Sequence, residues 1–356
     1  MIVLVVALWI VSLGLLLVTL LPLVRSPRWW VRVWDYPRLQ VASALALALV
    51  GQLLLLGREG PEIALMLATA AGLAWQIWRI WPYTRLHRRQ VLPAKASDPS
   101  RSIRLLVANV LQDNRRADLL LRRVEEADPD LVLAVETNGW WDERLAVLRE
   151  DRPFAVCHPL ENTYGMHLFS RLELSDIRVQ DRVSQDIPSF FARVRLRSGT
   201  LVNLHCVHPE PPQPGNDVAE RDAELMLVAR EAEKDGRPTI VCGDLNDVAW
   251  SHTTRMFQRI SGLLDPRIGR GLYPTFHAEH RLARWPLDHV FHDASFRLVR
   301  LEVLDYFGSD HFAILVELLH DPAAVALHEI PEADAEDRTE AAEKIAEGRE
   351  AAAEAS

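Results

Sequence analysis

The residues best suited to chemistry in this chain follow an apolar run near its middle. Residues 239–242 (TIVC) predict a buried strand, and Gly243 allows the backbone to turn sharply where that strand ends. The turn presents Asp244 and Asn246, two positions apart, on the same side. A carboxylate and an amide directed at one point suit a site that holds a phosphate, a metal ion and a water. The same pattern is typical of an ordinary surface turn, so the interpretation depends on the residues that accompany it.

Polar residues close several other apolar runs in the same way. In α/β folds the ends of strands are where ligands bind. Oxygen donors without a Cys/His cluster favour a hard cation such as Mg²⁺. A histidine beside a carboxylate suits the activation of a water, and a second histidine with an asparagine could donate to a phosphoryl group. The set is Asn109, Glu136, His208, Asp244, Asn246, Asp288, Asp310 and His311.

The elements that must position this set belong to residues 103–319. Short β-rich runs alternate there with helical periodicity, which is clearest over residues 116–127 and 218–234. This alternation predicts a layered α/β domain.

Five motifs of this domain, taken in order, resemble those of the endonuclease/exonuclease/phosphatase superfamily of metal-dependent phosphohydrolases. The motifs are the strand-terminal Asn109, the strand-terminal Glu136, GDLN, LDHVF and the final SDH. The resemblance covers residues 103–319. It implies a four-layered α/β sandwich, in which two mixed β-sheets are flanked by helices, and the hydrolysis of a phosphoester.

The resemblance also implies a metal site. Glu136 matches the principal Mg²⁺ ligand, Asn109 lies beside it, and Asp310 matches a further carboxylate of the metal site; Mn²⁺ is the alternative ion. Some relatives have an acidic residue two positions after the strand-terminal asparagine, where this chain has Leu111. That departure weakens the case for a second metal.

The catalytic roles follow by the same matching of positions. Asp244 matches the residue that positions or deprotonates the attacking water, and Asn246 matches a phosphate contact. His311 matches a histidine that binds the scissile phosphate or acts as base, with Asp288 orienting its ring. His208 matches a residue that stabilises the transition state. The choice of base between Asp244 and His311 stays open.

The first 82 residues predict three transmembrane helices, at about residues 2–24, 39–57 and 62–81. A cleaved signal peptide fits the first run poorly, because no Lys or Arg precedes it and two further spans follow. Arginines flank the spans on the side that carries the rest of the chain, so the positive-inside rule predicts a multi-pass protein of the inner or cell membrane with a cytoplasmic catalytic domain. A periplasmic domain remains the alternative.

Two further segments carry no predicted chemistry. Residues 83–102 contain Pro and Ser and predict a linker. Residues 320–356 are acidic and rich in Ala and Glu without an apolar stripe, which predicts a disordered segment or a solvated helix. The formal net charge of −9 gives no reason to expect generic affinity for nucleic acid.

The sequence therefore predicts a membrane-anchored, Mg²⁺-dependent phosphoester hydrolase with a lipid bilayer as its one inferable partner. A nuclease-like phosphodiesterase, acting on a nucleic acid or nucleotide, is the first interpretation. The alternative is a phosphodiesterase or phosphatase that acts on phospholipid or sphingolipid headgroups at the membrane surface. A non-catalytic scaffold is disfavoured, because none of the matched site residues is degraded.

Overall fold

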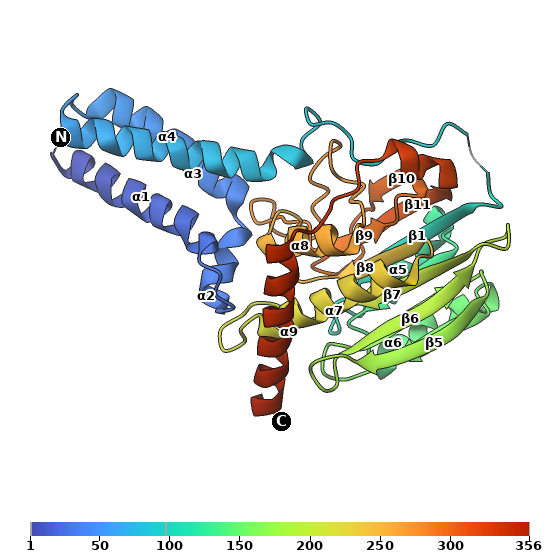
Figure 1. The fold of residues 1–356 in the computed structure, drawn as a ribbon. Coiled ribbons are helices and arrows are strands. Elements are labelled where there is room, and N and C mark those ends of the chain that lie inside the picture. The colour runs from blue at the N-terminus through green and yellow to red at the C-terminus, as the bar shows by residue number, and fades with distance from the viewer. Residues whose placement is uncertain (1, 97, 356) are drawn as a thin grey trace.

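Two mixed β-sheets pack face to face in the computed structural model, which describes residues 2–96 and 98–355 (Figure 1). The first sheet has the order β10 (Phe296–Val303), β11 (Ile314–His320), β1 (Ser102–Asn109), β2 (Leu131–Val135), β4 (Met166–Ser170) and β3 (Phe154–His158). The second has the order β5 (Leu174–Asp181), β6 (Pro188–Arg195), β7 (Leu201–Val207), β8 (Thr239–Asp244) and β9 (Asp288–His292). The pairs β1–β2 and β7–β8 are parallel, and the other pairs are antiparallel.

Helices cover the outer face of each sheet. The core between the sheets is formed by inward-facing residues of both, such as Leu133 of β2 and Leu204 of β7. On the outer face of the first sheet lie α5 (Ala117–Ala127) and α6 (Gly139–Leu145), and on that of the second lie α7 (Ala219–Asp235) and α8 (His252–Ser261). The apolar residues of α5 at 120, 124 and 127 share one face because of their helical spacing. The four-layered sandwich predicted from the sequence is confirmed.

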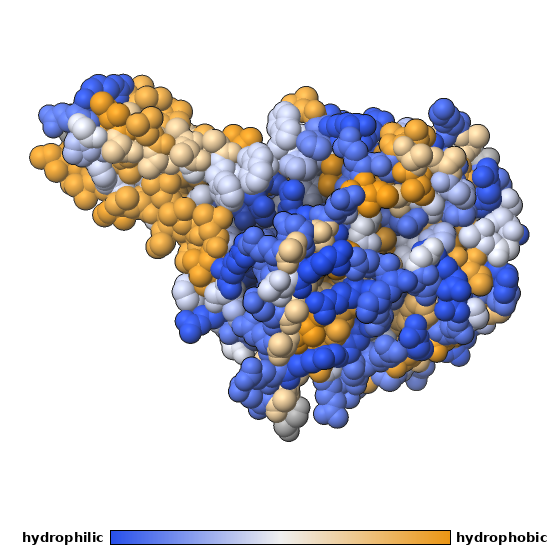
Figure 2. Space-filling view, viewed as in Figure 1, coloured by the Kyte–Doolittle hydropathy of each residue, from blue (hydrophilic) through white to orange (hydrophobic). Residues whose placement is uncertain are grey.

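Three long helices precede the sandwich and project from it as a bundle (Figure 1). They are α1 (Ile2–Leu20), α3 (Arg38–Leu55) and α4 (Gly60–Ile80), with the short α2 (Trp29–Arg32) between the first two. Each long helix, by length and composition, could cross a membrane. Figure 2 shows their apolar surface in orange beside the polar surface of the sandwich. The remaining helices are α9 (Ala335–Ala355) and the 3₁₀ turns Leu21–Leu23, Val33–Asp35, Trp81–Tyr83, Ala146–Glu150 and Pro322–Leu327.

The C-terminal segment corrects the prediction that residues 320–356 are disordered or a solvated helix. Helix α9 lies against α7 (Figure 1), and its Ala341 and Ile345 are buried in the apolar cluster of α7 and α8. Lys344 Nζ donates to the buried Asp222 Oδ2 at 2.7 Å. The contact uses small apolar residues and ion pairs, so the segment has no apolar stripe by which the sequence could reveal it.

Part of the predicted linker, residues 83–102, is also integrated into the sandwich. The backbone N–H of Ala94 donates to the carbonyl of Leu298 in β10, and the N–H of Leu298 donates to the carbonyl of Leu92. Val91 is fully buried in the core between the sheets. This part of the segment therefore extends the edge of the first sheet.

Candidate active site

The ends of neighbouring strands bring the predicted site residues to one rim of the sandwich. Asn109 is the last residue of β1, and Glu136 directly follows its parallel neighbour β2. In the second sheet, Asp244 ends β8 and pairs with Asp288, the first residue of the antiparallel β9. His311 lies just before β11, which is the other neighbour of β1. Residues more than 200 positions apart therefore share one site because of strand order alone.

A continuous set of polar contacts joins five of these residues. Asn109 Nδ2 donates to Glu136 Oε1 at 2.7 Å and to Asp244 Oδ2 at 3.0 Å. His311 Nδ1 lies 2.8 Å from Asp288 Oδ2, and its Nε2 lies 3.5 Å from Asp244 Oδ2. Asp288, Asp244 and Asn109 are almost fully buried. The site is thus a chain of oriented side chains that runs from Asp288 to Glu136.

The backbone is strained where it turns into this site. Leu111, Glu136 and Asn246 have φ angles of 56°, 63° and 49°, in the left-handed region that side chains other than glycine rarely adopt. Gly243 has φ 141°, and a Cβ there would lie 1.9 Å from the carbonyl oxygen of Val207. Such conformations cost about 1–3 kcal/mol each and cluster at functional sites.

Burial and neighbouring charges set the protonation states. Burial, reinforced by the carboxylates of Asp244 and Asp310, raises the pKa of Glu136 to about 7. Burial opposes the charged form of His311, but the carboxylates of Asp288 and Asp244 outweigh it and raise the pKa of His311 to about 10. Burial lowers the pKa of His208 to about 4. At neutral pH, His311 is therefore a cation with two N–H donors, whereas His208 is neutral.

The donor set fits a hard divalent cation. Four carboxylates, those of Glu136, Asp244, Asp288 and Asp310, face the single cation of His311. The Oδ1 atom of Asp288 is buried without a hydrogen bond among the described residues. Oxygen ligands with excess negative charge are the environment that Mg²⁺ and similar ions prefer. Single ligand atoms of Asp244, Asp288 and His311 all lie within 4.8 Å of one another, but both ring nitrogens of His311 already face carboxylates.

The remaining predicted residues lie at the same rim with different partners. The backbone N–H of Asn246 donates to Asp244 Oδ1 at 2.9 Å, while its side-chain Nδ2 donates to the carbonyl of Pro209. The ring of His208 lies 5.4 Å from that of Tyr164, and its Nδ1 has no hydrogen bond among the described residues. The predicted phosphate contact of Asn246 and the predicted role of His208 stay predictions.

Sequence reasoning missed residues that orient this set. Ser309 Oγ donates to the carbonyl of Asn109 at 2.8 Å and accepts from the backbone N–H of His311 at 3.0 Å. Thr275 Oγ1 accepts from the backbone N–H of Asp288 at 3.2 Å. The position of Ser309 inside GSDH was an available signal. Thr275 lies outside any strand or helix, so no strand end marks its position.

Three loops of the site are held by the 27–40 segment, which joins α1 to the first turn of α3. The N–H of Val218 donates to the carbonyl of Pro27, and Gln40 Nε2 donates to the carbonyl of Leu282. Between them, the hydroxyl of Tyr36 donates to the carbonyl of Asn246 at 2.6 Å, inside the GDLN motif. No local pattern in the sequence pairs these segments. The aromatic residues between the predicted spans are equally typical of a membrane interface, so they give no signal of contact with the sandwich.

Two buried tyrosines provide a matched test of this support. Tyr36 donates to Asn246, whereas Tyr83 donates to Ala249, three residues further along the same loop. Each Tyr→Phe change is expected to cost about 1 kcal/mol of stability, the usual net value of a hydrogen bond. Only Tyr36→Phe is expected to lower kcat, by about tenfold, because it removes one of the two donors, Tyr36 and Arg221, that hold the carbonyl of the strained Asn246. Thermal unfolding and kcat of the full-length protein check this, and equal kcat values for the two variants would contradict it.

The raised pKa of Glu136 predicts how metal affinity depends on pH. A proton competes with a cation for this carboxylate, so Mg²⁺ affinity is expected to rise about tenfold between pH 6 and pH 8. Without metal, the folded state binds this proton more tightly than the unfolded chain does. The stabilisation that protonated Glu136 gives the folded state is therefore complete below the ordinary pKa of 4.5, and it is lost as the pH rises through about 7. Calorimetric titration with Mg²⁺ at several pH values measures the effect, and Glu136→Gln should abolish it.

The fold and the site together define a class of protein, the DNase I-like α/β-sandwich phosphoesterases. The sequence matches the model of the Endonuclease/Exonuclease/phosphatase family over residues 106–311, and the chain belongs to that family. Members of the family are typically phosphoester hydrolases that use divalent metals. A search of curated proteins gave no match.

Solved structures share the fold at low sequence identity. A humanized TDP2 of D. rerio with 14 mutations superposes with a TM-score of 0.51 at 15% identity, covering 62% of this chain and 99% of that one. TDP2 of D. rerio in complex with a single-strand DNA product gives 0.51 at 16%, covering 61% and 98%. The human Nocturnin catalytic domain with bound sulfate gives 0.50 at 17%, covering 63% and 96%. At these identities the likeness concerns the fold alone.

Proposed function

We propose that this protein is a membrane-anchored, Mg²⁺-dependent phosphodiesterase whose substrate lies at the membrane surface. The observation that carries the catalytic part is the contact chain from Asp288 through His311, Asp244 and Asn109 to Glu136. It supplies a carboxylate base, a cationic donor and an acidic site for a cation within one buried cluster. Phosphoryl transfer depends chiefly on such positioning and neutralisation of charge.

The protonation states support one division of the two central roles. Against the cost of burial, the carboxylates of Asp288 and Asp244 raise the pKa of His311 to about 10, which favours a donor role for His311 over that of the base. It donates Nε2–H to a phosphoryl oxygen as negative charge develops, while Asp288 holds Nδ1–H and fixes the ring. Asp244 then accepts the proton of the attacking water. Its carboxylate is oriented for this by donors from Asn109 and from the backbone of Asn246.

Glu136, Asn109 and Asp310 are the residues that would hold the cation. When bound, Mg²⁺ would polarise a phosphoryl oxygen and neutralise charge at phosphorus. Asn109 also positions the cation site relative to the base, because its Nδ2 donates to both Glu136 and Asp244. The neutral His208 is suited to donating one hydrogen bond to the substrate without adding charge.

The contacts of the 27–40 segment favour a lipid-borne phosphodiester as the substrate. Val218, Asn246 and Leu282 lie in three different loops of the site. Each is hydrogen-bonded to this segment, which joins α1 to the first turn of α3. If those helices span a bilayer, the rim of the site lies close to the headgroup layer. The exposed Leu282, at 88% exposure, would face the same surface.

A nuclease-like activity is the second candidate, and one observation favours it. Two guanidinium groups lie over the ring of Trp140, that of Arg115 at 4.8 Å and that of Arg144 at 5.4 Å from the ring centroid. An aromatic ring with flanking cations is a surface on which a single-stranded nucleic acid can stack. TDP2 of D. rerio, which shares the fold, has been crystallised with a single-strand DNA product.

The test uses the full-length protein in lipid nanodiscs with Mg²⁺, with Asp244→Asn as the inactive control. Phospholipids in the nanodisc, single-stranded DNA and a soluble chromogenic phosphodiester are offered separately. Metal-dependent release of a headgroup without cleavage of DNA is the expected result. Cleavage of DNA alone would overturn the lipid assignment and favour the second candidate. Turnover of no substrate, including the chromogenic ester, would contradict the phosphodiesterase proposal itself.

A further inference from the structure

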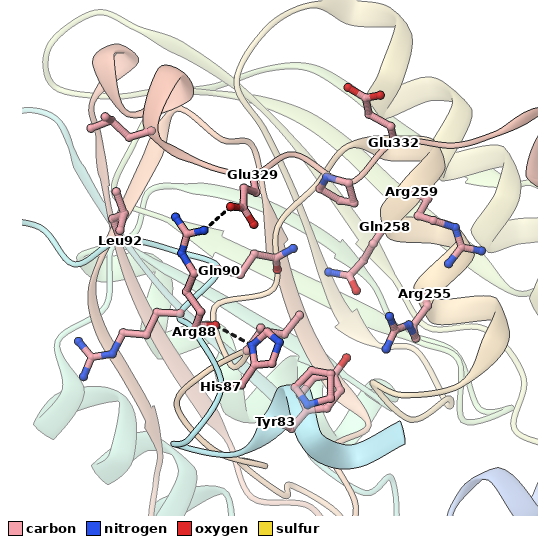
Figure 3. Close-up of a pocket in the computed structure, with 15 residues that line it drawn as sticks. Tyr83, His87, Arg88, Gln90, Leu92, Arg255, Gln258, Arg259, Glu329 and Glu332 are labelled. Carbon is pink, nitrogen blue, oxygen red and sulfur yellow. Dashed lines mark hydrogen bonds and ion pairs between the residues drawn. The ribbon is translucent and has the colours of Figure 1, made fainter. Parts of the chain in front are cut away.

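A second pocket lies apart from the candidate active site, where the chain leaves α4. It has a volume of about 310 Å³ and lies between residues 82–92, helix α8 and residues 327–332. Figure 3 shows its lining, which includes none of the residues assigned to the catalytic cluster. The volume falls within the range typical of small-molecule sites.

One wall of this pocket carries a buried amide without a partner. The side chain of Gln258 on α8 is 5% exposed, and its Nε2 has no hydrogen bond among the described residues. In Figure 3 the amide of Gln258 points away from α8 into the pocket. A buried donor left unpaired is costly, so a ligand that offers an acceptor here would be stabilised.

The same wall carries an unpaired positive charge. Arg255, one turn before Gln258, has no ion pair among the described residues, and it repels the nearby guanidinium of Arg79. Of the other arginines of the lining, Arg259 pairs with Asp337 and Arg88 pairs with Glu329, whereas Arg89 has no ion pair among the described residues. An anion beside Arg255 would weaken the repulsion between Arg255 and Arg79. It would also accept hydrogen bonds from Arg255 and from Gln258 Nε2.

The rest of the lining includes the apolar side chains of Pro82, Leu92, Ile268 and Leu327 and one further carboxylate, that of Glu332. We propose that this pocket binds a phosphate-bearing anion through Arg255 and Gln258. Two sources share this chemistry: the headgroup of an anionic phospholipid, which is available where α4 ends, and a soluble phosphate compound. Basic pockets at the ends of membrane helices are known to hold such headgroups.

The test measures thermal unfolding of the full-length protein in nanodiscs of phosphatidylcholine. Phosphatidylglycerol is then mixed into the nanodisc, or inorganic phosphate is added to the solution. Stabilisation by either probe is expected, and Arg255→Gln should weaken the apparent affinity at least about tenfold, since it removes a charged hydrogen-bond donor. Arg122→Gln, an exposed change on α5, removes the same charge elsewhere and should have no effect.

Two further variants test the role of the Gln258 amide and separate this pocket from the candidate active site. Gln258→Leu removes the unpaired amide, so it should stabilise the ligand-free protein and weaken binding. Asp244→Asn should retain the stabilisation, which separates this pocket from the active site. Stabilisation by phosphatidylglycerol alone assigns the headgroup, and stabilisation by inorganic phosphate assigns the soluble source. No stabilisation by either probe, or an unchanged response in Arg255→Gln, would overturn the proposal.

Discussion

Replacing Asp244 by asparagine is expected to lower kcat by about 10³-fold, within the usual contribution of a general base. The change keeps the shape of the side chain and its donor from the backbone of Asn246. It removes the charge that faces His311 Nε2 at 3.5 Å and the group that accepts the proton of the attacking water. KM is expected to change little, because the carboxylate acts on the water.

The stability of this variant separates a catalytic from a structural role. Asp244 is buried beside Asp288 and near Glu136, which its charge repels, and it faces His311, which its charge attracts. Because these effects oppose each other, Asp244→Asn should unfold close to the wild-type temperature while its activity is lost. Asp113→Asn, an exposed change in the loop after β1, is the matched control and should alter neither quantity. A variant that loses activity only because it unfolds would refute the assignment.

Glu136→Gln is expected to weaken Mg²⁺ binding about 100-fold or more, because the site loses the carboxylate assigned as principal ligand. Turnover at a low concentration of Mg²⁺ should fall by a similar factor. Raising the concentration of Mg²⁺ should restore part of it, since Asn109 and Asp310 remain. Asp244→Asn should show no such rescue.

Calorimetric titration with Mg²⁺ and rates measured over a range of Mg²⁺ concentrations check this prediction. Glu125→Gln, an exposed change on α5, controls for the loss of a negative charge. Unchanged Mg²⁺ affinity in Glu136→Gln would show that the cation is held elsewhere. Equal loss of activity at every Mg²⁺ concentration would also contradict the ligand role.

The sequence could group the residues of this rim because strand ends are local features, and the structure brings those strand ends together. Asn109, Glu136 and Asp244 each close an apolar run, and parallel neighbours end at the same edge of a sheet. The fold class followed from the alternation of β-rich runs and amphipathic helices, and the structure confirms it. The left-handed conformations of Glu136 and Asn246 could not be predicted, because neither residue is glycine.

The features that the sequence could not predict depend on contacts between distant segments. Helix α9 packs against α7 through small residues, and a Cβ on Gly348 would lie 2.4 Å from the Cβ of Ala223. Such an approach leaves no periodic apolar stripe in the sequence. The support of Asn246 by Tyr36 joins residues 210 positions apart, and no local pattern encodes it.

The N-terminal helices contact the loop that follows β8, and this contact limits how the protein can be divided. Tyr36, Ile80 and Tyr83 share one apolar cluster with Trp250 and Leu287 of the sandwich. A sandwich cut free at residue 102 would expose that cluster to water beside the candidate active site and would lose one of the two donors to the carbonyl of Asn246. The N-terminal helices and the sandwich are therefore not interchangeable modules, and a transplanted sandwich must carry residues 27–83 with it.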